Sequence, residues 1–441
     1  MIETSNIAEK TNIAVLPFVN MSASAENEYF SDGMTEEIIN ALAKIDGLKV
    51  TSRTSAFHFK GKNIPSPEIG KALGVSTLLE GSVRLAGNNL RITAQLIDAP
   101  EDFHFWSETW DRTLDNIFEV QEEISLLIAE KLREHIGHFE IEEPPETRPT
   151  QIGAYEWYLK SKSSFTKFQK ADLFRAVEEI ENAIAIDPGC PFYHASKAIY
   201  YGYLGLVDAI SGKQAFTLSK EAAARALQLD PRDPEANYSM GLVHYFFEKD
   251  LDTAESYLNL ALKYRPNYVN ALLGGSVMDV IAGHHERALS RVRKAIELDP
   301  LNPSHLYYHA SALQRMGRYE EALVEVNKLL KVLPHHTNSY CLKGTILTRL
   351  QRFAEAIEHY QTVPVSAEKT VSYHAGTGIV YAASGNRAMA AEYLLKWSAQ
   401  PQNLHLAAEE NPAVIINIYL GNTDLAFEEI EKDITAGKYY L

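Results

Sequence analysis

The segment ALQLDP (residues 226–231) recurs in altered form along the second half of the chain. Related segments end at four other prolines: AIAIDP at Pro188, ALKYRP at Pro266, AIELDP at Pro300 and LLKVLP at Pro334. The steps between successive prolines are 43, 35, 34 and 34 residues. A period of about 34 residues indicates a repeated structural unit, and this repeat decides the fold of the second half.

Small residues recur where two helices of each unit must touch, because a methyl group or a hydrogen allows helices to approach closely. Examples are Ala254, Ala261, Ala288, Ala295, Ala322, Ala356, Gly344 and Gly378. The pattern resembles tetratricopeptide (TPR) repeats, which implies an all-α superhelical solenoid over residues 151–435. We expect seven helix pairs from Tyr155 to about Gln400 and a weaker eighth up to Thr435. The 43-residue step predicts an insertion of about nine residues between helices, at residues 205–213.

Residues 12–138 have a different, mixed α/β character. Residues 13–16 form a continuous apolar run, typical of a strand that is covered on both faces. Residues 87–89 (Gly-Asn-Asn) lie between two β-rich runs and predict a hairpin turn. Residues 103–112 predict a further antiparallel strand with Trp106 and Trp110 on its core face. A longer helix then closes this domain, with Ile124, Ile128, Leu132 and Ile136 in one apolar row.

The stretch FSDGMTEEI (residues 30–38) combines three acidic and two hydroxyl residues. An apolar row at helical spacing follows, so the stretch predicts a helix N-terminus with a polar cap at its start. Glu36 and Glu37 would then lie in the first turn, where the helix dipole favours acids. A catalytic or metal-binding carboxylate cluster is the alternative.

Most of residues 12–136 is similar to the TolB-like N-terminal domain of bacterial signalling proteins. The similarity lies in IAVLPF (13–18), YFSDGMTEEIINALAKI (29–45), TSRTSAF (51–57), IGKALGVSTLLEGSVR (69–84), LRITAQLIDA (90–99) and FWSETWDR (105–112). Relatives with this layout often carry a nucleotide cyclase, a kinase or a winged-helix domain ahead of it. The resemblance implies an α/β fold in which FSDGMTEEI begins the first helix, and it carries no effector activity over to this chain. Residues 139–150, acidic and rich in proline, predict a linker.

The composition of the chain disfavours several classes of function. With 42 basic and 58 acidic residues the formal charge is −16, which disfavours binding to nucleic acid. Cys190 and Cys341 are too far apart in sequence for a zinc motif or a disulfide framework. No apolar run has membrane-spanning length and the N-terminus lacks signal-peptide features. We expect a cytoplasmic protein that does not insert into a membrane; the extracytoplasmic part of a membrane-anchored protein is the alternative.

Sequence motifs for catalysis are missing from the chain. It has no GxxxxGK(S/T), GxGxxG, HExxH or GxSxG motif, so the usual signatures of phosphate, dinucleotide, zinc and nucleophile sites do not occur. We therefore expect a non-enzymatic protein without a cofactor or a metal site. The alternative is a small-molecule-processing enzyme or a ligand-sensing regulator with a site in the N-terminal domain.

The repeats suggest a binding surface, because the first helices of stacked pairs line a concave groove. Counting back from the repeated prolines places six polar residues on this groove: Asn270, Tyr307, Gln314, Arg315, Asn338 and Arg349. Amide and guanidinium groups bind peptide backbones and carboxylates, so we predict a protein or peptide partner. Solvated groove walls are the alternative. The array also ends without an obvious polar capping helix, which keeps a homodimer as a further expectation.

Overall fold

The computed structural model describes residues 12–435, apart from residues 25–26, 44, 46, 115–116, 137–150, 168, 208, 335–336, 363–370 and 401–410. It divides into two compact units. The first unit runs to Gly275 and includes Arg293–Asn302; the second comprises Ser276–Val292 and the chain from Pro303. The predicted linker, residues 139–150, lies outside the described residues, so the predicted domain boundaries stay predictions.

The first unit begins with a mixed sheet of strand order β3-β1-β4-β5-β6, in which β2 also pairs with β4. The strands are β1 (Asn12–Val15), β2 (Val19–Asn20), β3 (Lys49–Val50), β4 (Thr77–Ala86), β5 (Asn89–Asp98) and β6 (Phe103–Thr113). β1 is parallel to β3 and β4, whereas β4, β5 and β6 form an antiparallel meander. The apolar run of β1 is buried because this strand has a neighbour on each side and side chains packed on each face.

Helices cover the two faces of the sheet unequally. α1 (Glu28–Leu42) and α4 (Ile117–Ile136) pack on one face, where Ile38 and Ile128 join Val83 and Ile92 in a common core. On the opposite face a smaller core, Phe59, Ile69, Leu73, Leu78 and Ile97, lies under α2 (Arg53–Phe57) and α3 (Ser66–Leu73). This smaller core covers only one end of that face. The next residues of β4 and β5 on the same face, Glu80 and Gln95, are polar.

Several predicted elements of this domain are confirmed. Residues 87–88 connect β4 to β5, and Gly87 takes the left-handed φ of 61° that a tight hairpin requires. β6 matches the predicted strand, and Trp110 on it is 3% exposed with its ring centroid 6.0 Å from that of Trp106.

The predicted start of the first helix is wrong. α1 begins at Glu28, before FSDGMTEEI, and its N-cap Asn27 makes no side-chain capping bond. The helix starts earlier because Phe30 is already buried in the core, at 2% exposure. Ser31 and Asp32 therefore lie inside the helix, and Glu36 lies in its third turn rather than in its first.

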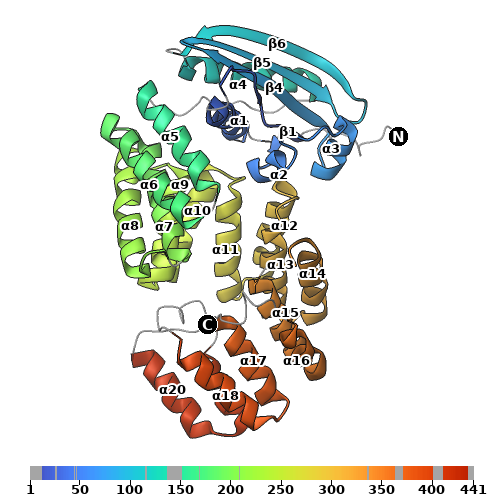
Figure 1. Cartoon of the computed structure of the whole chain (residues 1–441), viewed down its shortest axis with the longest axis vertical. Coiled ribbons are helices and arrows are strands. Elements are labelled where there is room, and N and C mark those ends of the chain that lie inside the picture. Colours follow the sequence, from blue (N-terminus) through green and yellow to red (C-terminus); the bar gives the residue numbers. More distant parts are fainter. Residues whose placement is uncertain are drawn as a thin grey trace. The chain divides into compact units, whose positions relative to one another are not determined.

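The rest of the described chain forms eight successive helix pairs (Figure 1). Those of the first unit are α5 (Ile152–Phe165) with α6 (Lys170–Ile186), α7 (Pro191–Leu206) with α8 (Gly212–Leu229), and α9 (Pro234–Val243), extended by the π-helix η3 (His244–Glu248), with α10 (Leu251–Tyr264). α11 (Val269–Ile281) and α12 (His285–Leu298) each have residues in both units. The second unit continues with α13 (Ser304–Arg315), α14 (Tyr319–Val332), α15 (Thr337–Arg349), α16 (Phe353–Gln361), α17 (Val371–Ala383), α18 (Arg387–Ser398), α19 (Pro412–Leu420) and α20 (Thr423–Thr435).

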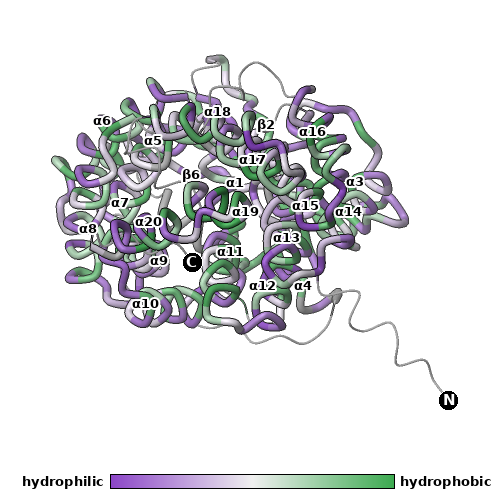
Figure 2. Tube along the Cα trace, turned by 90° about the horizontal axis from the view of Figure 1, so that it is seen from below, coloured by the Kyte–Doolittle hydropathy of each residue, from purple (hydrophilic) through white to green (hydrophobic). Residues whose placement is uncertain are grey.

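Packing within the pairs follows the small-residue pattern. Ala254, Ala261, Ala288, Ala295, Ala322 and Ala356 are all fully buried. A Cβ atom on Gly344 would lie 2.2 Å from the ring of Tyr360, so only glycine admits this tyrosine. Hydrophobic and hydrophilic residues alternate along the helices (Figure 2), as helices with one buried face require. The predicted fold class, an α/β domain followed by a TPR-like helical array, is confirmed.

The 43-residue step does not produce a long loop. α7 and α8 contain 16 and 18 residues, whereas α11 and α12 contain 13 and 14. Most of the extra residues therefore lengthen the two helices, and only a short connection, residues 207–211, separates them.

A second periodic feature lies in the turns of the five successive pairs from α9/α10 to α17/α18. Lys249, Gly283, Gly317, Gln351 and Gly385 all have φ between 58° and 83°, and they follow one another at steps of 34 residues. This left-handed conformation costs an L-residue with a Cβ atom about 1 kcal/mol. Glycine occupies three of these positions, but Lys249 and Gln351 adopt the same conformation under strain.

Gln351→Gly is therefore expected to raise the free energy of unfolding by about 0.5–1 kcal/mol. Gln361→Gly at the exposed end of α16 is the matched control, and it should lower the free energy of unfolding by a similar amount. Urea denaturation of both variants checks the pair. Destabilisation by both substitutions would show that residue 351 is not strained.

Candidate functional site

Five of the six predicted groove residues lie on two helices of the second unit. Tyr307, Gln314 and Arg315 belong to α13, whereas Asn338 and Arg349 belong to α15. Steps of seven and eleven residues return to nearly the same side of an α-helix, so Gln314 follows Tyr307, and Arg349 follows Asn338, along one face. α13 and α15 are in contact, which makes the five residues two neighbouring rows.

The exposure of these five side chains differs. Asn338 and Arg349 are exposed, and Arg315 is partly buried. Tyr307 packs against the hydrophobic core of the second unit, and Gln314 is only 9% exposed. The accessible part of the predicted groove surface therefore consists of Asn338 and Arg349 on α15 and of the partly buried Arg315 on α13. Binding of a partner by these residues stays a prediction.

Asn270, the sixth residue, lies in the first unit, on the part of α11 that precedes Gly275. Its partly buried side chain hydrogen-bonds to the Tyr268 hydroxyl, whose pKa is raised by burial. Since Asn270 and the other five residues belong to different units, we describe Asn270 separately from them.

Partly buried ion pairs lie at the junction between α1 of the α/β domain and α5 of the first helix pair. A Cβ atom on Gly33 of α1 would lie 2.4 Å from a methyl carbon of Leu159 on α5, so glycine permits this close approach. One turn farther on, Glu36 accepts a hydrogen bond from Lys162 of α5 at 2.8 Å and pairs with Arg53 of α2 at 3.2 Å. A single carboxylate thus joins three elements.

These charges stabilise one another in partly buried surroundings. Burial alone raises the pKa of the Glu36 carboxyl, but Lys162 and Arg53 outweigh this effect and hold the pKa below its usual value. Burial likewise lowers the pKa of Lys162, but the negative charge of Glu36 raises it well above its usual value. Both groups are therefore charged at neutral pH, and neither is poised to exchange a proton during catalysis.

A second ion pair lies nearby, within the helical array. Arg265, the last residue before Pro266, pairs with Glu235 of α9 at 3.3 Å. Burial raises the pKa of Glu235, but the charges of Lys162 and Arg265 lower it below the usual value. Lys162 therefore links the two ion pairs electrostatically.

The α/β domain also contacts the end of α12, within the first unit. Asp299 accepts hydrogen bonds from the backbone N–H of Ser55 at 3.0 Å and from its hydroxyl at 2.6 Å. The Ser55 hydroxyl oxygen in turn accepts the N–H of Leu301, and the N–H of Ser52 donates to the carbonyl of Leu298. Asp299 is only 2% exposed, so the α/β domain is attached to the fourth helix pair as well as to the first.

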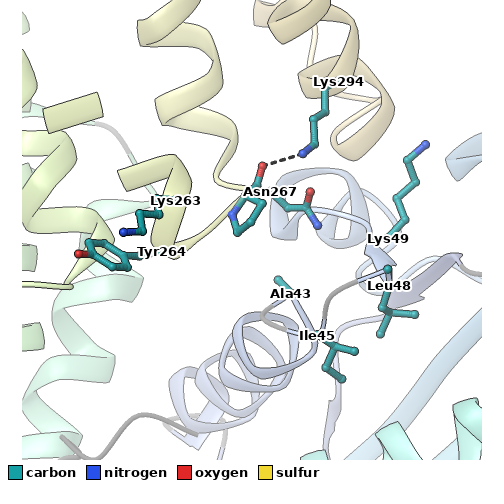
Figure 3. Close-up of a pocket in the computed structure, with 10 residues that line it drawn as sticks. Ala43, Ile45, Leu48, Lys49, Lys263, Tyr264, Asn267 and Lys294 are labelled. Carbon is teal, nitrogen blue, oxygen red and sulfur yellow. Dashed lines mark hydrogen bonds between the residues drawn. The ribbon is translucent and has the colours of Figure 1, made fainter. Parts of the chain in front are cut away.

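A hollow of about 410 Å³ lies between the α/β domain, α10 and the part of α12 that belongs to the same unit. Figure 3 shows residues that line it. Three lysines line it: Lys49 on β3, Lys263 on α10 and Lys294 on α12. Lys294 donates to the carbonyl of Pro266 at 2.8 Å, and Lys49 pairs with Glu297 at 2.7 Å. Lys263 extends over the ring of Tyr264. Because the three ammonium groups have separate partners, they do not converge on one anion.

Sequence reasoning missed the Glu36, Lys162 and Arg265 interactions. It treated Glu36 as an ordinary first-turn acid of a helix. A signal did exist for Arg265, which stands where three of the five repeated segments have the Asp of IDP or LDP. A departure from a repeat at one position indicates a contact that the other repeats do not make.

Comparisons with known proteins support the helical repeats. A model of the family described as anaphase-promoting complex, cyclosome, subunit 3 matches residues 282–363, which supports the TPR repeat region. A curated protein of Rhizobium meliloti (strain 1021), named "Putative adenylate cyclase 3", is 36% identical over 251 residues. The match covers 56% of this chain and 42% of that protein, so the chain spans less than half of the relative's length.

Solved structures show weaker similarity. A tetratricopeptide repeat protein from Parabacteroides merdae aligns over 63% of this chain and 100% of its own, with a TM-score of 0.44 and 16% identity. A chain of the APC/C hetero-tetramer Cut9–Hcn1 aligns over 63% of this chain and 52% of its own, with a TM-score of 0.45 and 14% identity. Because both the sequence identities and the TM-scores are low, these similarities support no conclusion about the function of this chain. Among the described residues, no helix combines the length and apolar character needed to cross a bilayer.

Glu36→Gln is expected to lower the free energy of unfolding by about 2–4 kcal/mol, because it leaves the partly buried charges of Lys162 and Arg53 without their carboxylate. Asp111→Asn, which breaks the exposed Arg91–Asp111 pair of the sheet, is the control and should have little effect. Urea denaturation measures both. Equal, small effects would contradict a structural role for Glu36.

Asp233, the N-cap of α9, gives the stability of the first unit a pH dependence. It caps α9 by accepting the Ala236 N–H at 2.7 Å, and burial, helped by the charge of Glu235, raises its pKa to about 7. Between about pH 4 and about pH 7 the folded protein retains a proton that the unfolded chain has released, so stability falls as the pH rises. Asn also caps helices but does not titrate.

The stability of Asp233→Asn relative to the natural protein should therefore increase by about 1.4 kcal/mol per pH unit over this range and level off above it. Urea denaturation at a series of pH values checks the slope. A difference that is constant with pH would show that Asp233 keeps an ordinary pKa.

Proposed function

We propose that this chain is a non-enzymatic interaction module of a bacterial signalling system and binds an extended segment of a partner protein along α13 and α15. The proposed contacts on this surface are Tyr307, Gln314, Arg315, Asn338 and Arg349. Asn270, in the first unit, is proposed separately as a partner contact. The arrangement that supports the proposal is the pair of neighbouring rows on two first helices of the array.

The length of the rows favours a polypeptide over a small molecule. Asn338 and Arg349 are eleven residues apart on α15, which corresponds to about 16 Å along the helix. The amides of Asn338 and Gln314 suit the backbone of an extended peptide, and the guanidinium groups of Arg315 and Arg349 suit a carboxylate. An acidic side chain or a C-terminal carboxylate of the partner would therefore lie near Arg315 and Arg349.

The charged junction of the first unit favours a structural role over catalysis. Glu36 and Glu235 each have a cationic partner within 3.3 Å, and their pKa values are lowered rather than raised towards neutrality. General acids and bases need a pKa near the working pH and access to a substrate. The junction instead fits a rigid attachment of the α/β domain to the helical array.

A signalling role draws support from the printed name of the Rhizobium relative, which is that of a cyclase. We propose that the α/β domain is TolB-like and that the chain is the regulatory region that accompanies such an effector. A homodimer remains part of the proposal. The acidic net charge argues against nucleic acid as the partner.

The test uses the full chain, because the α/β domain and the first helix pairs pack as one unit. A partner isolated on the natural protein is identified and titrated by calorimetry. Arg315→Ala with Arg349→Ala should weaken its binding about 100-fold, since two charge-assisted hydrogen bonds are lost.

The matched control is Arg318→Ala with Arg352→Ala. These two exposed arginines lie 34 residues apart, and each forms paired hydrogen bonds with a glutamate of its own turn, Glu321 or Glu355. The control should bind the partner as the natural protein does. Equal affinities for the two double variants would refute the proposed surface.

A further inference from the structure

A hollow of about 440 Å³ lies in the α/β domain, on the sheet face that α3 covers only in part. Its floor is formed by side chains of β4 and β5, and one wall by the connection between α2 and α3. It lies next to Leu16 and Pro17, which directly follow β1. In sheets with parallel strands, ligands bind preferentially at the carboxyl ends of the strands. The volume is within the range of small-molecule sites.

Strand register determines the floor. Glu80 of β4 is paired with Gln95 of β5, and Ser82 is paired with Thr93. Residues two apart on a strand, and residues directly opposite on neighbouring strands, share one face of a sheet. The four polar side chains therefore form a compact square beside the apolar core of Leu78 and Ile97.

Three of these four side chains have no partner among the residues that the structure describes. Glu80, Ser82 and Gln95 are partly buried, yet none makes a side-chain hydrogen bond or an ion pair with any residue that the structure describes. Only Thr93 is occupied, by a hydrogen bond to Thr109 at 3.0 Å. The polar atoms of these three side chains keep some contact with solvent and have no described protein partner, so they are available to hydrogen-bond to a ligand.

Charge indicates which ligand fits. Glu80 is the only acidic residue among those lining the hollow. Of the two lining lysines, Lys60 pairs with Asp32 at 2.5 Å and with Glu28 at 2.7 Å, whereas Lys62 lies 3.1 Å from a ring nitrogen of His58. Glu80 makes an ion pair with neither lysine nor with any other described residue, so a cationic ligand group would supply the missing partner.

We propose that this hollow binds a small aliphatic amine. Its ammonium group pairs with Glu80 and donates to Ser82 or Gln95, since an ammonium has three donors. Its carbon chain lies against the apolar wall formed by Leu16, Ile64 and Ile69. This site goes beyond the proposed function, because it gives the α/β domain a ligand of its own.

The test titrates the full chain with putrescine and, as a neutral molecule of the same length, 1,4-butanediol. Calorimetry should detect saturable binding of putrescine and none of the diol. Glu80→Gln should weaken putrescine binding at least 10-fold, whereas the control Glu101→Gln, at an exposed acid in the turn between β5 and β6, should bind as the natural protein does.

Ser82→Val provides a second variant in case Glu80→Gln disturbs folding, since valine suits a strand and fills part of the hollow. It should also weaken putrescine binding while the melting temperature is maintained. Failure of the natural protein to bind putrescine at millimolar concentration, equal binding of the diol, or unchanged binding by a folded Glu80 or Ser82 variant would overturn the proposal.

Discussion

The contact of Glu36 with Lys162 and Arg53 is the interaction on which the first unit depends. Three charged groups are partly withdrawn from water at this point, and removal of Glu36 leaves both cations without their carboxylate. Their geometry can be satisfied only when α1 lies against α5, and Gly33 provides the space for that approach. Hydrophobic packing alone would tolerate sliding of α1 along α5, whereas paired charges fix its position.

A second attachment, from Ser55 to Asp299, makes the connection more rigid. The α/β domain is bonded both to the first helix pair and to the end of α12, so the pairs between them cannot change their stacking without breaking one attachment. A repeat array normally transmits contacts only between neighbours. Here the α/β domain links two non-adjacent pairs. For this reason it forms one compact unit with the early repeats instead of a unit of its own.

The two proposed binding surfaces differ in kind. The rows on α13 and α15 present amides and guanidinium groups over a length that suits a polypeptide. The hollow beside β4 and β5 presents one carboxylate that pairs with no described residue, in a space that suits a small amine. A chain with both would combine recognition of a protein with recognition of a metabolite, and the ion pairs around Glu36 would provide the mechanical connection within the first unit.

Local sequence determined the elements of this protein. The 34-residue period, the buried alanines and the turn at Gly87 follow from helix packing and backbone sterics, which act over a few residues. Tertiary structure alone decided where α1 begins, that Glu36 meets Lys162, and that Glu80 and Gln95 share a hollow. These pairings join residues far apart in the chain, or depend on strand register, and a single sequence carries no distance information about them. Only the departure of Arg265 from its repeat gave an advance indication.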